Sequence, residues 1–423
     1  MRGKARRQGA KPWRNAYYFD RAVMDASRIE TPVVAPPLAP RRLIGVIGFT
    51  LALAYLVMLS GAWLQGQFLT DAENRPIVND FVDVYAAGRM ALSGDAASAY
   101  DWPLHKAAEV RALGHDFSGY YGWHYPPPFL FVAAVLALLP YLGAVFVWLA
   151  GTLAAYVLTL RCILHDRAGI FVALGFPAAI WNVTAGQNGF LTAALIGGTL
   201  AALERRPALA GVLLGLLTYK PQFGLLFPLA LIADRRWLTI AVAAAVASGM
   251  AAASALVFGA ASWQAFFHWL PITSHRVLGK GVADFDRLQS LYGLVRAHDG
   301  SETLAFAVQA AASIAAAIGT IWLWRSRSPF DLKAAALAAE TLVATPYVYM
   351  YDVTVLAVAV GFLLHYALER GFTVAEICGL AVGAALILVF PYVGTQEGLA
   401  AVLIVLALIV SRLALDQKRM ERE

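Results

Sequence analysis

Two acidic side chains, Asp80 and Asp83, follow the first long apolar segment of the chain, in the sequence NDFVDVYAAGRMALSG. If this segment is helical, a spacing of three residues places both carboxylates on one face. A partly desolvated carboxylate just outside a bilayer can have a raised pKa and act as a general base. A helix cap and a solvated loop acid would show the same spacing. The pair therefore supplies two candidates for a base.

A lysine, Lys220, lies in the apolar sequence LLTYKPQFGLL, between the short apolar segments 207–219 and 222–233. Segments of this length predict a shallow hairpin whose tip lies inside the outer half of the membrane. An ammonium group there costs about 2.5–3.5 kcal/mol unless it pairs or snorkels. The phosphate of a lipid lies at this depth, and Pro221 suits the start of a helix whose dipole also favours an anion. Lys220 is therefore a candidate phosphate ligand, with snorkelling as the alternative.

The segment 260–301 contains the basic sequence HWLPITSHRVLGKGVADFDRLQS. Arg276 and Lys280 are further candidates for binding a phosphate, and Arg287 is a third cation of the same loop. A solvated loop has the same composition, so that alternative stays open.

Aromatic and uncharged polar side chains gather near the expected membrane boundaries. The sequence YYGWHYPPPF offers rigid rings for stacking on a sugar, GQN offers amide groups, and TPYVYMYD brings tyrosines and an aspartate to a span end. Interfacial anchoring, hydrogen bonding between helices and helix capping are the alternatives. The candidates for binding the sugar or the acceptor are His124, Tyr125, Gln187, Asn188, Tyr349 and Asp352.

Residues that commonly hold metals form no convincing pattern. His268 and His275 lack the spacing of a metal site. Cys162 and Cys378 lie inside apolar runs, where we expect no disulfide between them. We expect no cofactor and no resident metal, although a carboxylate pair that binds a divalent cation stays open.

Most of the chain is expected to lie in lipid. Only 14% of its 423 residues are charged, against about 25% in a typical soluble protein, and the mean hydropathy is +0.63. A helix that crosses a bilayer needs roughly 20 mostly apolar residues. The sequence predicts an all-α polytopic membrane protein with about twelve crossings, near 43–64, 141–163, 168–185, 188–203, 207–219, 222–233, 237–259, 302–324, 333–345, 352–367, 373–390 and 398–414.

Basic residues that flank these segments predict their orientation. If the basic flanks face the cytoplasm, both termini lie inside and the long loops 65–126 and 260–301 face the exterior. The apolar stretch 127–140 is then expected to insert only halfway, because about 21 Å of helix is shorter than the hydrocarbon core. Within the first loop, YDWPLHKAAE is typical of an amphipathic helix on the membrane surface.

The organisation that follows has three parts. Residues 1–43 form a basic cytoplasmic tail, expected to be disordered, residues 44–415 form the membrane domain, and residues 416–423 form a second cytoplasmic tail. The short cytoplasmic turns leave no room for a nucleotide-binding domain, and no Walker-type loop or Rossmann fingerprint occurs in the sequence. Chemistry is therefore expected at the outer face of a bacterial inner membrane, where nucleotide sugars and ATP are absent. These considerations favour a lipid-borne activated substrate and no nucleic-acid partner.

The order of these motifs resembles glycosyltransferase family 87, the polyprenol-phosphate-mannose-dependent mannosyltransferases. The matching pieces are DFVDVYAAGRMALSG with AYD (80–101), HYPPPFLF (124–131), the segment from GQN to YKPQ (186–222) and TPYVYMYD (345–352). The resemblance implies a GT-C type fold with an active site at the extracytoplasmic face. It also implies that Asp80 is the base in preference to Asp83, because the family's DF motif falls on Asp80. The family's lysine before a proline corresponds to Lys220.

The function implied is transfer of mannose or another hexose from a polyprenyl phosphate donor to an extracytoplasmic glycan or glycolipid acceptor. The anomeric configuration would invert, with an aspartate as general base. The expected partners are the donor lipid, the acceptor and membrane lipid. A transporter or flippase for a lipid-linked sugar is the alternative, and a non-catalytic scaffold is another. Transporters place charges at mid-membrane, often in two repeat halves, whereas here the acidic candidates lie at the outer boundary and no clear repeat is visible.

Overall fold

The structure of the protein is a computed structural model that describes residues 38–282 and 284–420. This part of the chain is built from helices and the turns between them, with no β-strand. Most of the expected basic tail, residues 1–37, lies outside the described residues. The last helix continues through Met420, so residues 416–420 extend a membrane helix.

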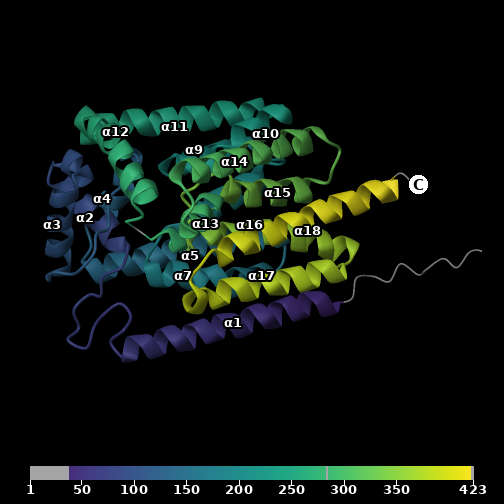
Figure 1. Ribbon diagram of the computed structural model, residues 1–423, viewed down its shortest axis with the longest axis horizontal. Coiled ribbons are helices and arrows are strands. Elements are labelled where there is room, and N and C mark those ends of the chain that lie inside the picture. Colours follow the sequence, from purple (N-terminus) through teal and green to yellow (C-terminus); the bar gives the residue numbers. More distant parts are fainter. Residues whose placement is uncertain (1–37, 283, 421–423) are drawn as a thin grey trace, which may run out of the picture. The chain divides into compact units, whose positions relative to one another are not determined.

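Seven of the described helices are long and apolar enough to cross a bilayer. Figure 1 shows that they run broadly along one direction, so their apolar surfaces can share one slab of lipid. They are α1 (Leu38–Leu64), α5 (Tyr141–Leu164), α11 (Trp237–Phe258), α14 (Glu302–Arg325), α16 (Leu356–Arg370) with the preceding turn η7 (Asp352–Val355), α17 (Val374–Val393) and α18 (Glu397–Met420).

A further crossing is broken. The helices α6 (Ala168–Gly175) and α7 (Pro177–Ala185) meet at an angle of 56°. Pro177 has no N–H to donate and disfavours a helical conformation at the residue before it. Phe176 accordingly has an extended backbone between the two helices. The pair counts as one bent span or as a re-entrant segment.

The expected number of about twelve crossings is not confirmed, because the described residues give seven long spans, or eight with the bent pair. The other apolar segments form helices of 7 to 14 residues, which reach at most about 21 Å. Hydropathy identifies apolar helices correctly here but does not distinguish a full crossing from a partial one. These shorter helices are α8 (Gly189–Ala202), α9 (Pro207–Leu216), α10 (Phe227–Ala233) and α15 (Phe330–Val343).

The segment that joins α1 to α5 is largely helical. It contains α2 (Phe81–Leu92), η1 (Ala96–Tyr100), α3 (Trp102–Leu113), η2 (Pro127–Phe129) and α4 (Leu130–Leu136). The stretch 127–140 is too short to cross, as predicted. The expected amphipathic helix exists as α3, but its buried face carries His105 and Glu109, both fully buried, while Leu104 is half-exposed. This helix packs on α2 and η1.

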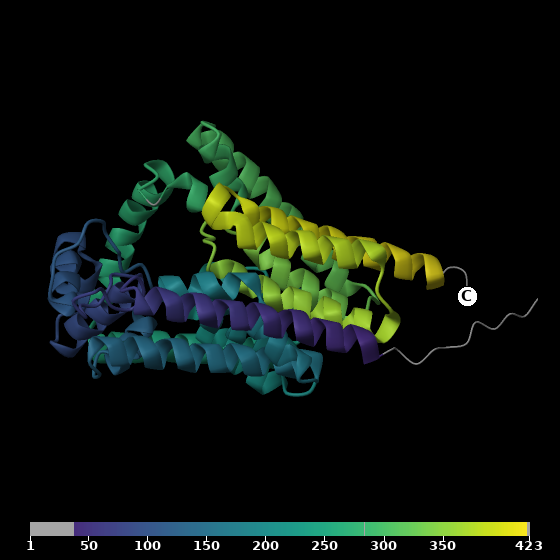
Figure 2. The same ribbon diagram turned by 90° about the horizontal axis from the view of Figure 1, so that it is seen from below.

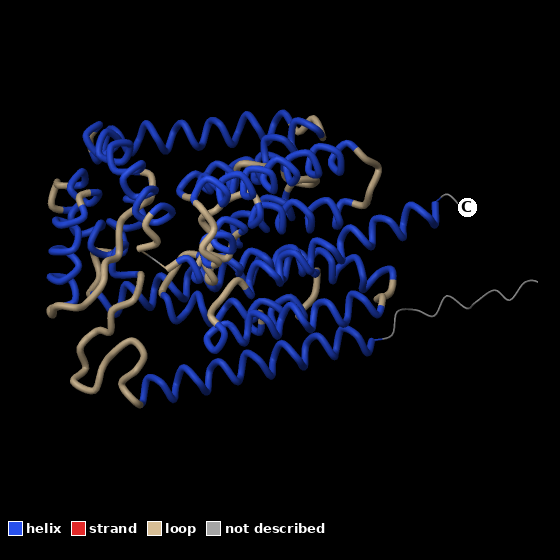
Figure 3. Tube along the Cα trace, in the orientation of Figure 1, coloured by secondary structure: helices blue, strands red, loops and turns tan. Residues whose placement is uncertain are grey.

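The second long segment, between α11 and α14, also folds into short helices. It contains α12 (Ala260–Ser274), the π-helical turn η5 (His275–Gly279), the turn η6 (Phe285–Arg287) and α13 (Leu291–Ala297). Figures 1 and 2 place α2, α3 and α12 at one end of the bundle, and the start of α1 and the end of α18 at the other. The tube in Figure 3 shows that long irregular connections also collect at the end that holds α2 and α3.

The end of the bundle that holds the start of α1 is tied together by polar contacts. Arg41 in α1 lies 3.2 Å from a carboxylate oxygen of Asp166 in the α5–α6 turn. The His165 ring in that turn lies 5.1 Å from the His365 ring of α16, and His365 contacts Asp331 in α15 at 2.8 Å. Several of the basic residues that flank the apolar segments, and from which the orientation was predicted, therefore lie at the same end of the bundle.

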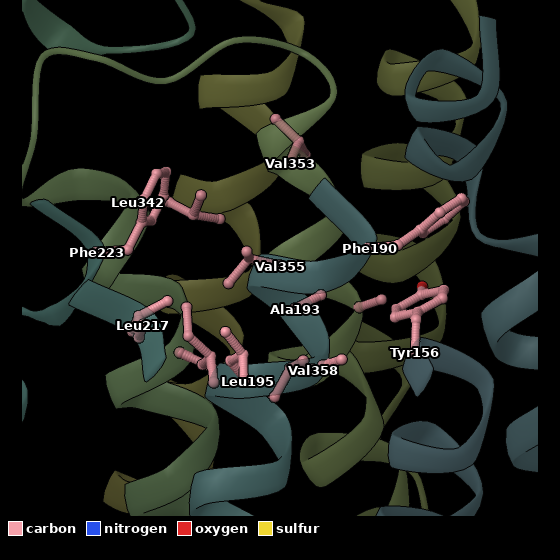
Figure 4. Close-up of a cluster of buried hydrophobic side chains, with 14 of the residues drawn as sticks. Tyr156, Phe190, Ala193, Leu195, Leu217, Phe223, Leu342, Val353, Val355 and Val358 are labelled. Carbon is pink, nitrogen blue, oxygen red and sulfur yellow. The ribbon is translucent and has the colours of Figure 1, made fainter. Parts of the chain in front are cut away.

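Figure 4 shows a buried apolar cluster to which several helices and turns contribute. Side chains from α5, α8, α15, α16 and the turns η3 (Leu217–Tyr219), η4 (Pro221–Gly224) and η7 interlock there. Phe223 and Val353, which are fully buried in this cluster, stand close in sequence to Lys220 and Asp352. Packing of this core therefore fixes the turns that carry the two charged residues.

Candidate active site

A cavity of about 1370 Å³ lies where the first long segment, the α7–α8 turn, the α12–η6 region and residues 345–352 meet. Eight of the eleven residues predicted for the site line it, although they come from five separate stretches of sequence. The eight are Asp80, Asp83, His124, Tyr125, Gln187, Lys220, Tyr349 and Asp352. The three others, Asn188, Arg276 and Lys280, do not line it.

Asp80 is held at the start of α2 by the α7–α8 turn. Its backbone N–H donates to the carbonyl of Ala185 at 2.9 Å, and its Oδ2 accepts from Nε2 of Gln187 at 3.1 Å. Gly186 ends α7 in the left-handed conformation, with φ of 70°, which a residue with a Cβ rarely adopts. The reversal at Gly186 brings Gln187 back over Asp80.

A chain of side-chain hydrogen bonds fixes the orientation of Gln187. The amide of Asn188 donates to the hydroxyl of Tyr125 at 2.6 Å, and this hydroxyl donates to Oε1 of Gln187 at 3.2 Å. Because Oε1 accepts from Tyr125, Nε2 points at Asp80. Gln187 and Tyr125 therefore line the cavity, but the Tyr125 hydroxyl and Oε1 of Gln187 are hydrogen-bonded to each other. Asn188, which does not line the cavity, donates to the Tyr125 hydroxyl and fixes its position.

The electrostatic surroundings of the two aspartates differ. Burial raises the pKa of Asp80 to about 6, opposed by the hydrogen bond from Gln187 and by the charges of Arg287 and Lys220. Burial raises the pKa of Asp83 well above its usual range, and the neighbouring Asp80 and Glu109 raise it further. Oδ1 of Asp83 is buried and has no hydrogen-bond partner among the described residues. At neutral pH a pKa of about 6 leaves Asp80 ionised and able to accept a proton, whereas the surroundings of Asp83 shift that carboxyl group towards its protonated form.

Lys220 and Asp352 form a buried ion pair. The ammonium Nζ lies 2.6 Å from Oδ1 of Asp352, and the two side chains are only 7% and 2% exposed. Oδ2 of Asp352 also accepts from the backbone N–H of Tyr349 at 3.1 Å, which closes the turn before α16. Asp352, predicted as a ligand for sugar or acceptor, thus has its oxygens engaged by Lys220 and the backbone. The helix breaks at Lys220, between the turns η3 and η4. Thr239 at the start of α11 hydrogen-bonds to the carbonyl of Pro207 at the start of α9, so the chain has returned to the same end of the bundle by residue 239. Lys220 therefore lies at the tip of a hairpin.

The cations of the 260–301 segment divide in an unexpected way. Arg287 lines the cavity, whereas Arg276 lies over the ring of Trp102 at 4.3 Å and Lys280 is exposed outside the lining. The structure therefore replaces Arg276 and Lys280 with Arg287 as the loop cation that faces the cavity. In the sequence, Arg287 is recognisable only as a third basic residue of the same loop.

Two stacked pairs of aromatic rings line the cavity. Trp102 and Tyr120, from the first long segment, stack at 4.1 Å, and Tyr349 and Tyr351, from the turn before α16, stack at 5.6 Å. Flat aromatic faces of this kind suit contact with a sugar ring. His124 also lines the wall and lies 6.0 Å from the Trp102 ring.

A buried pair behind the cavity wall was not found from the sequence. His105 and Glu109, both in α3, lie 3.6 Å apart with no exposed surface and no hydrogen-bond partner among the described residues. Burial lowers the pKa of His105 to about 3 and raises that of Glu109 to about 8, so both are uncharged at neutral pH. Their i,i+4 spacing alone predicts a solvated surface pair.

Groups with the geometry of a metal site lie elsewhere in the described part of the chain. Asp331, His365 and Glu369 bring three ligand atoms within 4.8 Å of one another, at the end of the bundle that holds the start of α1. None of them lines the cavity. Both cysteines are free, as expected.

Comparison with known protein families gives a match to this chain. The model of glycosyltransferase family 87 matches residues 123–346, just over half of the chain. This range includes Gln187, Lys220 and Arg287, whereas Asp80 and Asp352 lie on either side of it. No curated protein and no solved structure gives a significant match.

Proposed function

Because this chain belongs to glycosyltransferase family 87, we propose that it transfers mannose or another hexose from a polyprenyl phosphate to a glycan or glycolipid acceptor. In this proposal the fold is of the GT-C type, the membrane is a bacterial inner membrane, and the cavity faces away from the cytoplasm. The gathering of basic helix flanks at the end opposite the cavity supports this orientation.

The observation that carries the proposal is that Asp80 and Lys220 line one cavity. Transfer from a phosphate to a hydroxyl needs a base for the acceptor and positive charge for the leaving group. A carboxylate with a pKa near 6 and a lysine within an apolar hairpin meet these two needs from different segments of the chain.

The proposed step is a direct displacement. The acceptor hydroxyl gives its proton to Asp80 as its oxygen forms a bond to the anomeric carbon. The bond from that carbon to the phosphate oxygen breaks on the opposite face, and the anomeric configuration inverts. The electron pair leaves with the polyprenyl phosphate, and the proton leaves Asp80 for solvent before the next cycle. The base contributes about 10²–10⁴-fold to the rate.

Negative charge on the leaving phosphate grows during this step. Lys220 has three N–H donors, so it can keep its contact with Asp352 and still donate to a phosphate oxygen. Arg287, which is exposed on the cavity wall and lies 3.4 Å from a carboxylate oxygen of Asp284, supplies a second cation. Contacts that strengthen as this charge develops lower the barrier, rather than only tightening substrate binding.

The hydrogen-bond chain through Gln187 orients the base. Gln187 engages Oδ2 of Asp80, and no described residue donates to Oδ1. Oδ1 is therefore the oxygen that receives the acceptor proton. In this proposal Tyr125 and Gln187 position the base, and the stacked rings of Trp102 and Tyr349 contact sugars.

A transfer assay in proteoliposomes tests the proposal. Purified protein is given radiolabelled polyprenyl phosphate mannose and a membrane glycolipid extract, and the label in the acceptor fraction is counted. We expect time-dependent transfer that requires Asp80. If the donor lipid crosses the vesicle membrane while no label reaches any acceptor, the flippase alternative replaces the transferase.

A further inference from the structure

Three side chains that the proposed reaction does not use converge at the end of the bundle that holds the start of α1. Asp331 lies in the first turn of α15, and His365 and Glu369 lie one turn apart near the end of α16. One nitrogen or oxygen atom of each lies within 4.8 Å of those of the other two. None of the three lines the main cavity, so the cluster is a separate feature of the fold.

The two ring nitrogens of His365 face different carboxylates. Nδ1 lies 2.8 Å from Oδ2 of Asp331, and a carboxylate can only accept, so Nδ1 carries the proton of this hydrogen bond. In the neutral ring Nε2 then has a free lone pair. Nε2 lies 3.7 Å from Oε1 of Glu369, which is too long for a hydrogen bond. A lone pair and a carboxylate oxygen therefore face each other with no hydrogen bond between them.

This separation fits two ligands of one metal ion. Zinc binds histidine nitrogen and carboxylate oxygen at about 2.0–2.2 Å, so two of its tetrahedral ligands lie about 3.4 Å apart. The 3.7 Å between Nε2 of His365 and Oε1 of Glu369 is close to that value. A histidine that ligates a metal through one nitrogen commonly donates its other N–H to a carboxylate, and Asp331 accepts in this way here.

A second histidine reaches the same place from the α5–α6 turn. The ring centre of His165 lies 5.1 Å from that of His365. Two imidazole rings bound to one tetrahedral zinc ion have centres about 5 Å apart, given the same bond length. The left-handed backbone of His165, with φ of 53°, ends α5 and turns the chain beside α16. Its side chain is exposed, so the ring can adjust towards an ion without disturbing packing.

The charge and the exposure of the cluster suit a divalent cation. Asp331 and Glu369 supply two negative charges, while neutral histidines supply lone pairs. Arg41, a cation at this end of the bundle, is itself paired with Asp166 at 3.2 Å. Asp331 and His365 are only 20% and 18% exposed, whereas Glu369 is 58% exposed. An ion can therefore enter past Glu369 and be partly shielded from water.

We propose that His165, His365 and Glu369 bind a divalent transition-metal ion with the preferences of Zn²⁺. Nε2 of His365 and Oε1 of Glu369 are two of its ligand atoms, and Asp331 orients His365. A mixed set of imidazole and carboxylate suits zinc, whereas Mg²⁺ and Ca²⁺ prefer oxygen ligands throughout. The ion joins the α5–α6 turn to α16, two segments far apart in the sequence. It goes beyond the proposed function, because the transfer step uses no residue of this cluster.

Zinc binding to the full-length protein in detergent tests the proposal. The protein is prepared with a purification tag that contains no histidine, treated with a chelator, and titrated with Zn²⁺ in competition with a fluorescent chelator. We expect one tight site per chain. His165→Ala and Glu369→Gln, which change exposed side chains, should each lower the affinity at least about 100-fold. Asp331→Asn should lower it about 10- to 100-fold, the effect of losing a partner that only orients a ligand.

Matched controls separate ligation from general changes of surface charge. His298→Ala and Glu204→Gln alter exposed residues of the same types outside the cluster, so both should bind zinc as wild type does. Glu369→His exchanges one zinc ligand for another and should keep the affinity within about tenfold of wild type. Zinc should also raise the unfolding temperature of wild type and of both controls, but not that of His165→Ala.

X-ray absorption identifies the ligands directly. The zinc complex should show nitrogen and oxygen at about 2.0–2.2 Å, with the scattering of two imidazole rings and no sulfur. The proposal is overturned if wild type has no stoichiometric site, if a sulfur ligand appears, or if His165→Ala or Glu369→Gln binds zinc as tightly as wild type. None of these measurements involves sugar transfer, so their failure would leave the proposed function standing.

Discussion

The ammonium of Lys220 lies 2.6 Å from a carboxylate oxygen of Asp352, although 132 residues separate the two in the chain. Neither charge could be buried at this depth alone, since an unpaired ion in a low-dielectric interior costs several kcal/mol. The pair therefore joins the hairpin tip to the turn before α16 and presents a fixed cation to the cavity.

Breaking this pair should cost stability and donor affinity by separate routes. We expect Lys220→Met or Asp352→Asn to lower the free energy of unfolding by about 3–5 kcal/mol, because each leaves one charged partner uncompensated. The double variant should recover much of that stability, but its affinity for the donor should stay as low as that of Lys220→Met. Thermal unfolding in detergent and binding of radiolabelled donor measure the two effects. A double variant no more stable than the worse single variant would contradict this account.

Replacement of the base should separate chemistry from binding. Asp80→Asn keeps the size of the side chain and an acceptor for Gln187, so the fold and donor binding should be retained. We expect kcat to fall by about 10²–10⁴-fold. The matched control is Asp83→Asn, which should keep most of the turnover. Full activity of Asp80→Asn would assign the base to another residue.

The pH profile should report the raised pKa of Asp80. The base works in its charged form, so kcat/KM should rise with pH through about 6 and then level off. Gln187→Leu removes a hydrogen bond that favours the charged carboxylate, so the rising limb should move to higher pH. Asn188→Leu, which removes a donor to Tyr125 only, should move it less. A limb near pH 4 in the wild-type enzyme would indicate a solvated base.

Among the three cations of the 260–301 segment, only Arg287 should affect the donor strongly. A charge-assisted hydrogen bond contributes about 1.5–3 kcal/mol, so Arg287→Ala should raise the donor KM by about 10- to 100-fold. Arg276→Ala and Lys280→Ala serve as controls, because neither residue lines the cavity. Comparable KM values in all three variants would mean that the loop acts only through its overall charge.

Asp83 should weaken the fold at neutral pH. Its folded-state pKa is raised, so the unfolded chain releases this proton above about pH 4 while the folded protein retains it. Stability is then lost as the pH rises from about 4 towards the folded-state pKa. Asp83→Asn removes that loss. Its unfolding temperature should equal that of wild type at pH 4 and exceed it at pH 7.5, and a lower value at pH 7.5 would show that the carboxyl group stabilises the fold.

Polar and aromatic motifs at predicted membrane boundaries identified most of the cavity wall. The reason is physical, because helix ends that face the same side of a membrane collect in one place whatever their order in the chain. Asp80, Gln187 and Lys220 could be found in this way. Family 87 membership was also predicted and is confirmed.

Pairing within the cavity could not be predicted. Nothing in the sequence shows that Asp352 engages Lys220 rather than a substrate, or that Gln187 turns its amide towards Asp80. Such contacts depend on packing between distant segments. The choice of Arg287 over Arg276 depends on the local path of η5 and η6, which spacing does not encode.

The brevity of the hairpin at Lys220 has a consequence for the surrounding bilayer. Its two arms, Pro207–Tyr219 and Pro221–Ala233, each reach at most about 20 Å, less than the roughly 30 Å of a hydrocarbon core. We expect the bilayer beside this hairpin to thin locally, because exposed apolar helix and acyl chains adjust to a common length. A lipid headgroup would then have a shorter distance to travel from the membrane surface to Lys220. In membranes with longer acyl chains the bilayer would have to thin more, so the same movement would cost more elastic energy.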